Sequence, residues 1–294
     1  MRPGNTPAPL HSRLVPALAL VLGISLPASS APATRFLVIC SPGSPGTTAQ
    51  AQPTLDAFAR AAGRSAGWPE SRLTAAYFET AEAGLARLAR PDAALALVPS
   101  AFLDRYGKEL GLKPRMEAVP ESGKPEIWSL IAKKGRLPSA AALKGWEVTG
   151  TPGYAPDFVR STLLKEWGSL PADTRITFTP RVLTALRRAA AGEEVAVLLD
   201  TAGSEALSSL PFAGDLETVA RSRPLPGALL CTVGSRLPAG EADALFRGLS
   251  RLSEQEGGAE VIQSLRLSRF APLGWSAAAG GARAGQGAAP GSRP

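Results

Sequence analysis

Hydroxyl groups and two carboxylates are the side chains of this sequence best placed to bind or transform a small molecule. They lie in five short polar stretches, at 41–48, 79–80, 99–102, 149–154 and 200–201. None of these stretches contains a lysine or an arginine, whereas Glu79 and Asp200 are acidic. Hydroxyls and backbone N–H groups at helix ends can hold an oxyanion. Two carboxylates near one site instead favour a small polar or zwitterionic ligand, one that carries an amine or several hydroxyls.

The candidate ligand-binding residues in these stretches are Ser41, Ser44, Thr47, Thr48, Glu79, Thr80, Ser100, Thr149, Thr151, Gly153, Tyr154, Asp200 and Thr201. Several of them have a structural alternative that the sequence leaves open. Asp200 could simply cap the helix that follows it, and Glu79 could be a solvated first-turn residue favoured by the helix dipole. Tyr154 could pack in the core with its hydroxyl bonded.

Histidine occurs once, at position 11, inside a segment that we expect to be removed. Its loss excludes Ser-His-Asp and Cys-His catalysis and His-ligated zinc from the mature chain. An enzyme would then need carboxylates or a cofactor, and the side chains that it could use are Glu79, Asp200 and Cys231. We predict a protein that is not an enzyme and that uses neither a metal ion nor a cofactor.

The first 33 residues have the composition of a secretory signal. Two arginines accompany the apolar run 14–26, which is too short to span a bilayer, and small residues follow it. We therefore predict a signal peptide at 1–33, whose cleavage places the protein in the periplasm or outside the cell without stable membrane insertion. Residues 276–294 are rich in Gly, Ala and Pro, which predicts a disordered tail.

The net charge of the chain and the spacing of its basic residues indicate whether a nucleic acid is a partner. The formal charge of +7 falls to +3 without the four arginines at positions 2, 13, 283 and 293, and the remaining basic residues are scattered. This is not the basic stripe of a nucleic-acid-binding protein, so we expect no nucleic acid as a partner.

Short apolar runs alternate with helical patterns along the chain, which predicts βαβ units and mostly parallel sheets flanked by helices. The predicted strands are 35–40, 73–78, 93–98, 146–150, 174–178, 195–200, 216–220 and 227–234. About 240 residues remain between the two ends, more than one domain usually holds, so we expect two α/β lobes. Lobe 1 is predicted at 34–134 and 227–275, and lobe 2 at 135–226, with 126–134 and 227–234 as the two hinge-strand crossovers.

Four longer stretches carry more specific patterns. They are DAALALVPSAFL, GKPEIWSLIAKKG, AALKGWEVTGTPGYAPDFVRSTLL and RVLTALRRAAAGEEVAVLLDTAG, and IQSLRLSRFAPLG closes the folded part. Their order and spacing resemble the type 2 periplasmic-binding-protein superfamily, in particular its phosphate, phosphite and phosphonate-binding branch associated with ABC transporters. The resemblance covers most of the folded region.

The resemblance implies a monomer that closes by a hinge around a small-molecule ligand and delivers it to an ABC permease. It does not carry the ligand over. The phosphonate binders have a run of hydroxyl residues before the Gly-Tyr of the second lobe, and here that run is Thr151-Pro152. A sensing or interaction protein with a vestigial cleft remains the alternative on the same fold.

Two further questions concern the first strand. If the helix after it begins near Gln52, then Thr47 and Thr48 lie in a surface loop; if it begins at Thr48, they can face a ligand. We favour the second arrangement. The sheet order implied by the resemblance puts one strand between Cys40 and Cys231, about 9–10 Å apart. This is too far for a disulfide, so we expect two buried free thiols.

Overall fold

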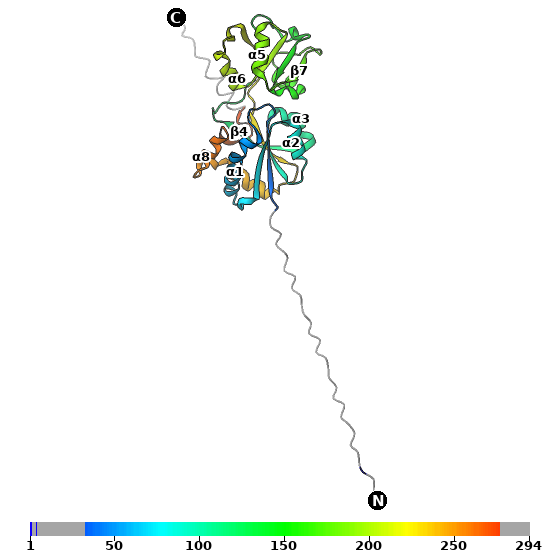
Figure 1. Cartoon of the computed structure of the whole chain (residues 1–294), viewed down its shortest axis with the longest axis vertical. Helices are drawn as coiled ribbons and strands as arrows, with labels where there is room; N and C mark the ends of the chain where they lie inside the picture. The colour runs from blue at the N-terminus through cyan, green and yellow to red at the C-terminus, as the bar shows by residue number, and fades with distance from the viewer. Residues whose placement is uncertain (2–3, 5–32, 277–294) are drawn as a thin grey trace, which may run out of the picture. The chain divides into compact units, whose positions relative to one another are not determined.

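The computed structural model describes residues 1, 4 and 33–276. The described chain forms two β-sheets flanked by helices, which confirms the predicted two-lobed α/β class (Figure 1). We call the part built on the six-stranded sheet lobe 1 and the part built on the five-stranded sheet lobe 2. The predicted signal peptide at 1–33 and the predicted tail at 276–294 lie almost entirely outside the described residues.

The lobe 1 sheet has the strand order β11-β4-β10-β3-β1-β2. These strands are β1 (Arg35–Cys40), β2 (Leu73–Phe78), β3 (Ala93–Pro99), β4 (Leu112–Pro120), β10 (Ala228–Val233) and β11 (Leu267–Pro272). The first three are mutually parallel, and β10 and β11 join the sheet in antiparallel pairs. Six of the seven residues of β3 are buried, because a central strand has both faces covered by helices.

The lobe 2 sheet has the order β7-β6-β8-β5-β9. Its strands are β5 (Ser129–Lys133), β6 (Glu147–Gly150), β7 (Arg175–Phe178), β8 (Val195–Leu199) and β9 (Leu216–Arg221). One predicted boundary was wrong here. Residues 126–134 are predicted in lobe 1, but β5 pairs with β8 and β9 in the second sheet. The chain thus crosses between lobes before β5 and not after it.

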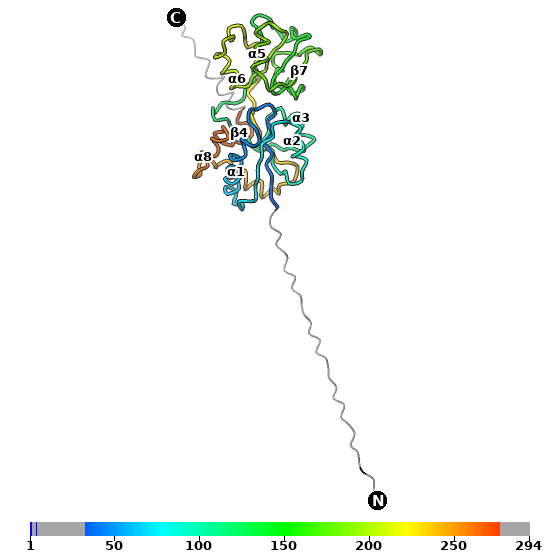
Figure 2. The backbone as a smooth tube through the Cα atoms, in the orientation of Figure 1, coloured from blue at the N-terminus to red at the C-terminus, as the bar shows by residue number. Residues whose placement is uncertain are grey.

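The two crossovers run side by side. Glu126 and Leu225 form an isolated antiparallel bridge, with N···O distances of 2.9 and 2.8 Å in the two directions. Figure 2 lets both crossings be followed, the first in green and the second in yellow. Lobe 1 is consequently discontinuous in sequence, and its blue and cyan N-terminal part packs with the orange C-terminal part.

Helices cover both faces of the lobe 1 sheet. Within residues 33–276 the α-helices are α1 (Thr48–Ser65), α2 (Ala81–Leu88), α3 (Ser100–Leu110), α4 (Pro156–Phe158), α5 (Val182–Ala191), α6 (Thr201–Ala206), α7 (Ala239–Ser250) and α8 (Gly258–Ser264). Helices α1, α7 and α8 share one core cluster with Phe58 and Phe270, whose rings are 5.8 Å apart. Helices α2 and α3 contribute to another cluster, which includes Leu88 and Phe102.

Helix α1 begins at Thr48, as the ligand-facing arrangement requires. Thr47 is its N-cap, and Thr47 and Gln50 form a reciprocal capping box. Pro53 lies inside the helix, at its sixth residue, so α1 lacks the hydrogen bond that an N–H at this position would donate to the Ala49 carbonyl.

Both cysteines are buried and free, and β3 lies between their strands. This confirms the expectation that they do not form a disulfide. Burial raises the pKa of each thiol to about 12. A buried thiol that stays protonated at neutral pH is a small apolar packing group and a poor nucleophile.

We predict that native protein reacts slowly with a thiol-specific chromogenic reagent at neutral pH, because both thiols are buried and protonated. Unfolding without reductant should expose both of the two cysteines in the sequence. Titration with Ellman's reagent measures the number of reactive thiols per chain, for the native protein in buffer and for the unfolded protein in urea. A titre of zero in urea would show a disulfide and contradict the strand order.

Candidate functional site

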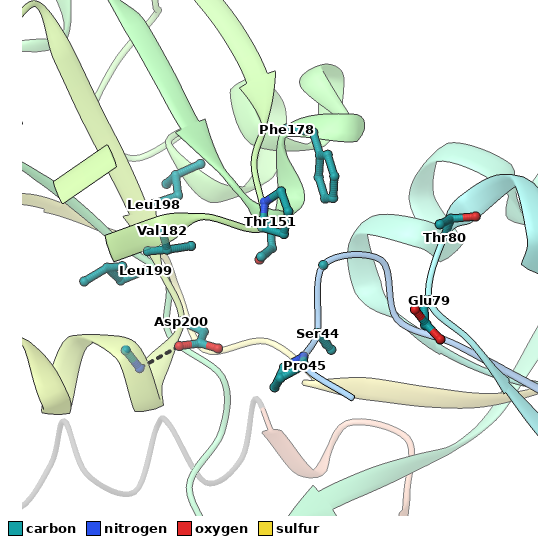
Figure 3. Close-up of a pocket in the computed structure, with 13 residues that line it drawn as sticks. Ser44, Pro45, Glu79, Thr80, Thr151, Phe178, Val182, Leu198, Leu199 and Asp200 are labelled. Carbon is teal, nitrogen blue, oxygen red and sulfur yellow. Dashed lines mark hydrogen bonds between the residues drawn. The ribbon is translucent and has the colours of Figure 1, made fainter. Parts of the chain in front are cut away.

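A pocket of about 650 Å³ is formed by loops from both lobes. From lobe 1 come the loops that follow β1 and β2, and from lobe 2 those that follow β6, β7 and β8 (Figure 3). These five strands are parallel within their sheets, so their carboxyl ends meet at one edge of each sheet, where open α/β folds hold their ligands. We call this cavity the interlobe pocket.

Five of the thirteen candidate residues line the interlobe pocket: Ser44, Glu79, Thr80, Thr151 and Asp200. The lining residues that the sequence analysis did not propose are Gly43, Pro45, Phe178, Pro180, Val182, Leu198, Leu199 and Gly203. Phe178 ends the predicted strand 174–178, so the rule of strand carboxyl ends would have found it. Its side chain is 43% exposed, which leaves an aromatic ring available in the wall.

The polar groups of the pocket are acidic or neutral. Glu79 reaches it from lobe 1 and Asp200 from lobe 2, and none of the described lining residues is a lysine or an arginine. Thr80 and Asp200 also serve as N-caps, since they accept hydrogen bonds from the N–H groups of Ala83 and Gly203. A negatively charged ligand would meet repulsion in this pocket, whereas a positively charged group would be attracted.

Bonds within lobe 1 engage the hydroxyls of the first loop. The Thr48 N–H donates to Glu79 Oε1 at 2.9 Å, and the Thr48 hydroxyl donates to the Tyr77 carbonyl at 2.9 Å. The hydroxyls of Ser41 and Ser44 are 2.7 Å apart. Tyr77 donates its hydroxyl to the carbonyls of both serines, at 3.3 and 3.2 Å, and so fixes the loop that forms one wall of the pocket.

Ser41 and Thr47 face a separate cavity of about 490 Å³, which shares Pro45 with the interlobe pocket. The cavity lies against the core cluster of α1 and α8, and most of its surface is apolar. Of the four candidates in this stretch, Ser44 lines the interlobe pocket, Ser41 and Thr47 line this second cavity, and Thr48 lines neither.

The lobe 2 loop after β6 is packed tightly against β7. Thr149 is buried, and its hydroxyl bonds to the Thr177 carbonyl at 3.2 Å. A Cβ on Gly153 would lie 1.9 Å from the same carbonyl oxygen, so only glycine fits there. Neither Thr149 nor Gly153 lines the pocket; they position Thr151, which does.

Tyr154 connects the cores of the two lobes. It packs in core clusters of both, stacks on Tyr106 at a ring distance of 6.5 Å and meets the edge of Phe178 at 6.1 Å. Its buried hydroxyl has no hydrogen-bond partner among the described residues, and burial raises its pKa. Tyr154 acts here as an apolar contact between the lobes and does not line the pocket.

Thr201 and Ser100 bond to the two crossovers. The Thr201 N–H and hydroxyl both contact Glu126 Oε1, at 2.6 and 2.8 Å, and the Ile127 N–H donates to the Thr201 hydroxyl at 2.8 Å. The Ser100 hydroxyl donates to the Pro226 carbonyl at 2.7 Å. These two candidates therefore fasten each lobe to a crossover and are not in the pocket wall.

Two candidate nucleophiles of the described region, Ser65 and Cys231, lie within regular secondary structure. Ser65 lies in the G-x-S-x-G sequence 63–67, but it ends helix α1, and its hydroxyl donates to the Ala62 carbonyl. A nucleophile elbow instead requires a strand-to-helix turn. Cys231 is buried within β10.

Among residues 33–276, no three His, Cys, Asp or Glu side chains gather as a metal site would need. No helix in the same part of the chain is long and apolar enough to cross a membrane.

Comparison with solved structures identifies the fold. A Xanthomonas citri protein, XAC2383, solved bound to ATP, matches with a TM-score of 0.62 and 14% identity over 85% of this chain and 98% of that one. A binding protein component of an ABC phosphonate transporter from Pseudomonas aeruginosa matches with a TM-score of 0.54 and 15% identity over 82% of each chain. The chain has the two-lobed fold of type 2 periplasmic binding proteins.

A third neighbour is PhnD1 from Prochlorococcus marinus, solved in complex with methylphosphonate. It matches with a TM-score of 0.53 and 13% identity over 81% of this chain and 93% of that one. No protein-family model and no curated protein sequence matches the chain. The resemblance drawn from the sequence motifs is thus confirmed for the fold, and at these identities the ligands of the neighbours do not transfer.

Glu126 gives the crossovers a pH dependence that can be measured. Burial raises the pKa of its carboxyl above the ordinary value of 4.5. A native state that holds a proton more tightly than the unfolded chain gains stability as the pH falls through the raised pKa, and the gain is complete below the ordinary pKa. Glu126→Gln removes this titration but keeps an oxygen for both Thr201 bonds.

We therefore expect the free energy of unfolding of the wild type, relative to Glu126→Gln, to rise as the pH is lowered from neutral toward about 4.5. Urea unfolding of both proteins across this pH range measures the difference. A difference that stays constant over the range would contradict the burial of an ionisable Glu126.

Proposed function

We propose that this protein is an extracytoplasmic solute-binding protein that captures a small polar ligand in the interlobe pocket and delivers it to an ABC importer. The observation that carries the proposal is the pocket itself. It is walled by strand-end loops of both lobes, and its charged groups are Glu79 on one side and Asp200 on the other.

Electrostatics favour a ligand that carries a positive charge, such as an amine or a zwitterion with its amine toward the two carboxylates. Opposite charges within a few ångströms attract more strongly in a partly desolvated cleft than in bulk water. Phe178 adds an exposed aromatic face, on which a cationic group can also rest. A phosphonate would need a compensating positive group in the same molecule to be accommodated here.

The solved structures that share this fold support the proposal that the chain binds a ligand. Two of them are named as a transporter binding component and as a methylphosphonate complex. Export by the predicted signal peptide would place this chain where such proteins meet their ligands, and we expect it to act as a monomer that is recognised by an ABC permease.

A second candidate function has one observation in its favour. Tyr154 already fills space between the lobes, and most candidate hydroxyls bond within the protein. These contacts also suit a sensing or interaction protein whose cleft no longer binds a small molecule. A test of ligand binding separates the two functions.

We expect a thermal-shift screen to find ligands among amines, amino acids and polyamines, and not among phosphate, phosphite or simple phosphonates. A ligand at one hundred times its Kd stabilises the native state by about 2.7 kcal/mol. For a chain of this size, that raises Tm by roughly 5–10 °C. If no compound of any class shifts Tm, the sensing or interaction protein becomes the better description.

Asp200→Asn tests the pocket as the binding site. Asparagine can still accept the Gly203 N–H, so the N-cap of α6 is kept while the charge is lost. We expect the variant to melt close to the wild type and to bind a cationic hit about tenfold more weakly. Isothermal titration measures the change, and unaltered affinity would place the ligand elsewhere.

A further inference from the structure

A second cavity, of about 490 Å³, lies in lobe 1 beside the interlobe pocket, and we call it the lobe 1 cavity. Its floor is the sheet, where Ala118 of β4 and Ala228 of β10 pair in register. Ile39 of β1 and Leu97 of β3 also pair and continue the floor. Its walls are the first half of α1 and residues 264–267, between α8 and β11. Alanine at two paired floor positions leaves room that larger side chains would fill.

The lobe 1 cavity lies where open α/β sheets place their ligands. The chain runs from β1 through α1 to β2 toward one edge of the sheet, and from β3 through α3 to β4 toward the other edge. The direction reverses between β1 and β3, and such a switch point opens a crevice beyond the carboxyl ends of the two strands. Ser41, directly after β1, and Val98 and Pro99, at the end of β3, line the cavity. None of the described residues that line the interlobe pocket belongs to β3.

The two cavities suit opposite chemical groups. Leu55 and Leu97 are buried in the wall and floor of the lobe 1 cavity, and none of its described lining residues is acidic. Arg266 also lines it, but the side chain of Arg266 is 88% exposed. An ammonium group would find no counter-charge in this cavity, whereas an alkyl or aromatic group would remove apolar surface from water. The interlobe pocket instead offers the carboxylates of Glu79 and Asp200 to a cation.

The two cavities adjoin at one side chain. Pro45 lines both of them, and Figure 3 shows it beside Ser44 in the wall of the interlobe pocket. The loop that carries Pro45 is fixed by Tyr77, whose hydroxyl donates to the carbonyls of Ser41 and Ser44 at 3.3 and 3.2 Å. A ligand that occupies both cavities must therefore pass along Pro45, with its charged group on one side and its apolar group on the other.

We propose that the lobe 1 cavity is a second compartment of the ligand site and holds an alkyl or aromatic part of the ligand. The ligand class that fits both cavities is an amphiphilic amine, with its ammonium group near Glu79 and Asp200 and its apolar part past Pro45. The proposal rests on the proposed function for the position of the ammonium group. It adds a preference for amines with an apolar part over polyamines and hydrophilic amino acids.

The test is isothermal titration of propylamine, butylamine, pentylamine and hexylamine into the wild type. Each methylene that enters the lobe 1 cavity should lower Kd about threefold to fourfold, the effect of burying one CH₂ group. Hexamethylenediamine has the carbon chain of hexylamine and a second charge at its end, and burial of that charge opposes binding. We expect it to bind about tenfold or more weakly than hexylamine.

Two leucine substitutions on α1 form a matched pair. Ala51 lines the lobe 1 cavity, whereas Ala49 is exposed and lines neither cavity. Ala51→Leu fills part of the cavity, so we expect Kd to change less than about twofold per methylene, while Ala49→Leu keeps the dependence of the wild type. Asp200→Asn should weaken all four amines by a similar factor and keep the dependence on chain length. Should Ala51→Leu not fold, Ala228→Val fills the same cavity from β10.

The proposal is overturned if the amines bind the wild type with a Kd that does not depend on chain length, or if Ala51→Leu keeps the dependence of the wild type. If no amine binds, the proposed cationic ligand fails, and titration with hexanol tests the lobe 1 cavity alone. Hexanol should bind the wild type and Ala49→Leu, and Ala51→Leu more weakly. No binding to the wild type, or equal binding to both leucine variants, would reject the cavity as a ligand compartment.

Discussion

The whole site depends on the geometry of parallel strands. A parallel sheet directs the carboxyl ends of its strands to one edge, and the connecting loops must leave from that edge toward the helices. Strands β1 and β2 of lobe 1 and strands β6, β7 and β8 of lobe 2 end at the interlobe pocket, so residues as far apart in sequence as Gly43 and Gly203 line one cavity. The paired crossovers at Glu126 and Leu225 hold the two edges opposite each other.

This geometry is also what made much of the structure predictable. The short apolar run of β3 predicts a strand covered on both faces, and its position between β1 and β10 keeps the two cysteines apart. The rule that ligands sit beyond strand ends selected Glu79, Thr151 and Asp200, and it would have selected Phe178 had it been applied to β7. Periodicity does not say which sheet a strand joins, so it predicts β5 as a strand without placing it in lobe 2.

The partners of the candidate hydroxyls could not be predicted, because they come from distant segments. The cap of Asp200 is local, three residues from Gly203, and a sequence pattern suffices for it. Thr48 bonds to the end of β2, and Thr201 bonds to a crossover 75 residues away. Asp200 shows that the structural and the ligand-facing alternatives do not exclude each other, since one of its oxygens caps α6 while the residue lines the pocket.

On the proposed function, the distribution of charge would connect ligand binding to a relative movement of the lobes. Glu79 belongs to lobe 1 and Asp200 to lobe 2, so any motion that narrows the pocket brings two like charges closer and costs electrostatic free energy. Apolar contacts such as those of Tyr154 join the two lobes in this structure. A cationic group between the carboxylates would reverse the sign of the electrostatic contribution, since it attracts both lobes at once. A ligand shifts a conformational equilibrium only by its difference in affinity for the two forms. A cation held by one carboxylate from each lobe would bind more tightly when the pocket is narrow, because both carboxylates then lie close to it.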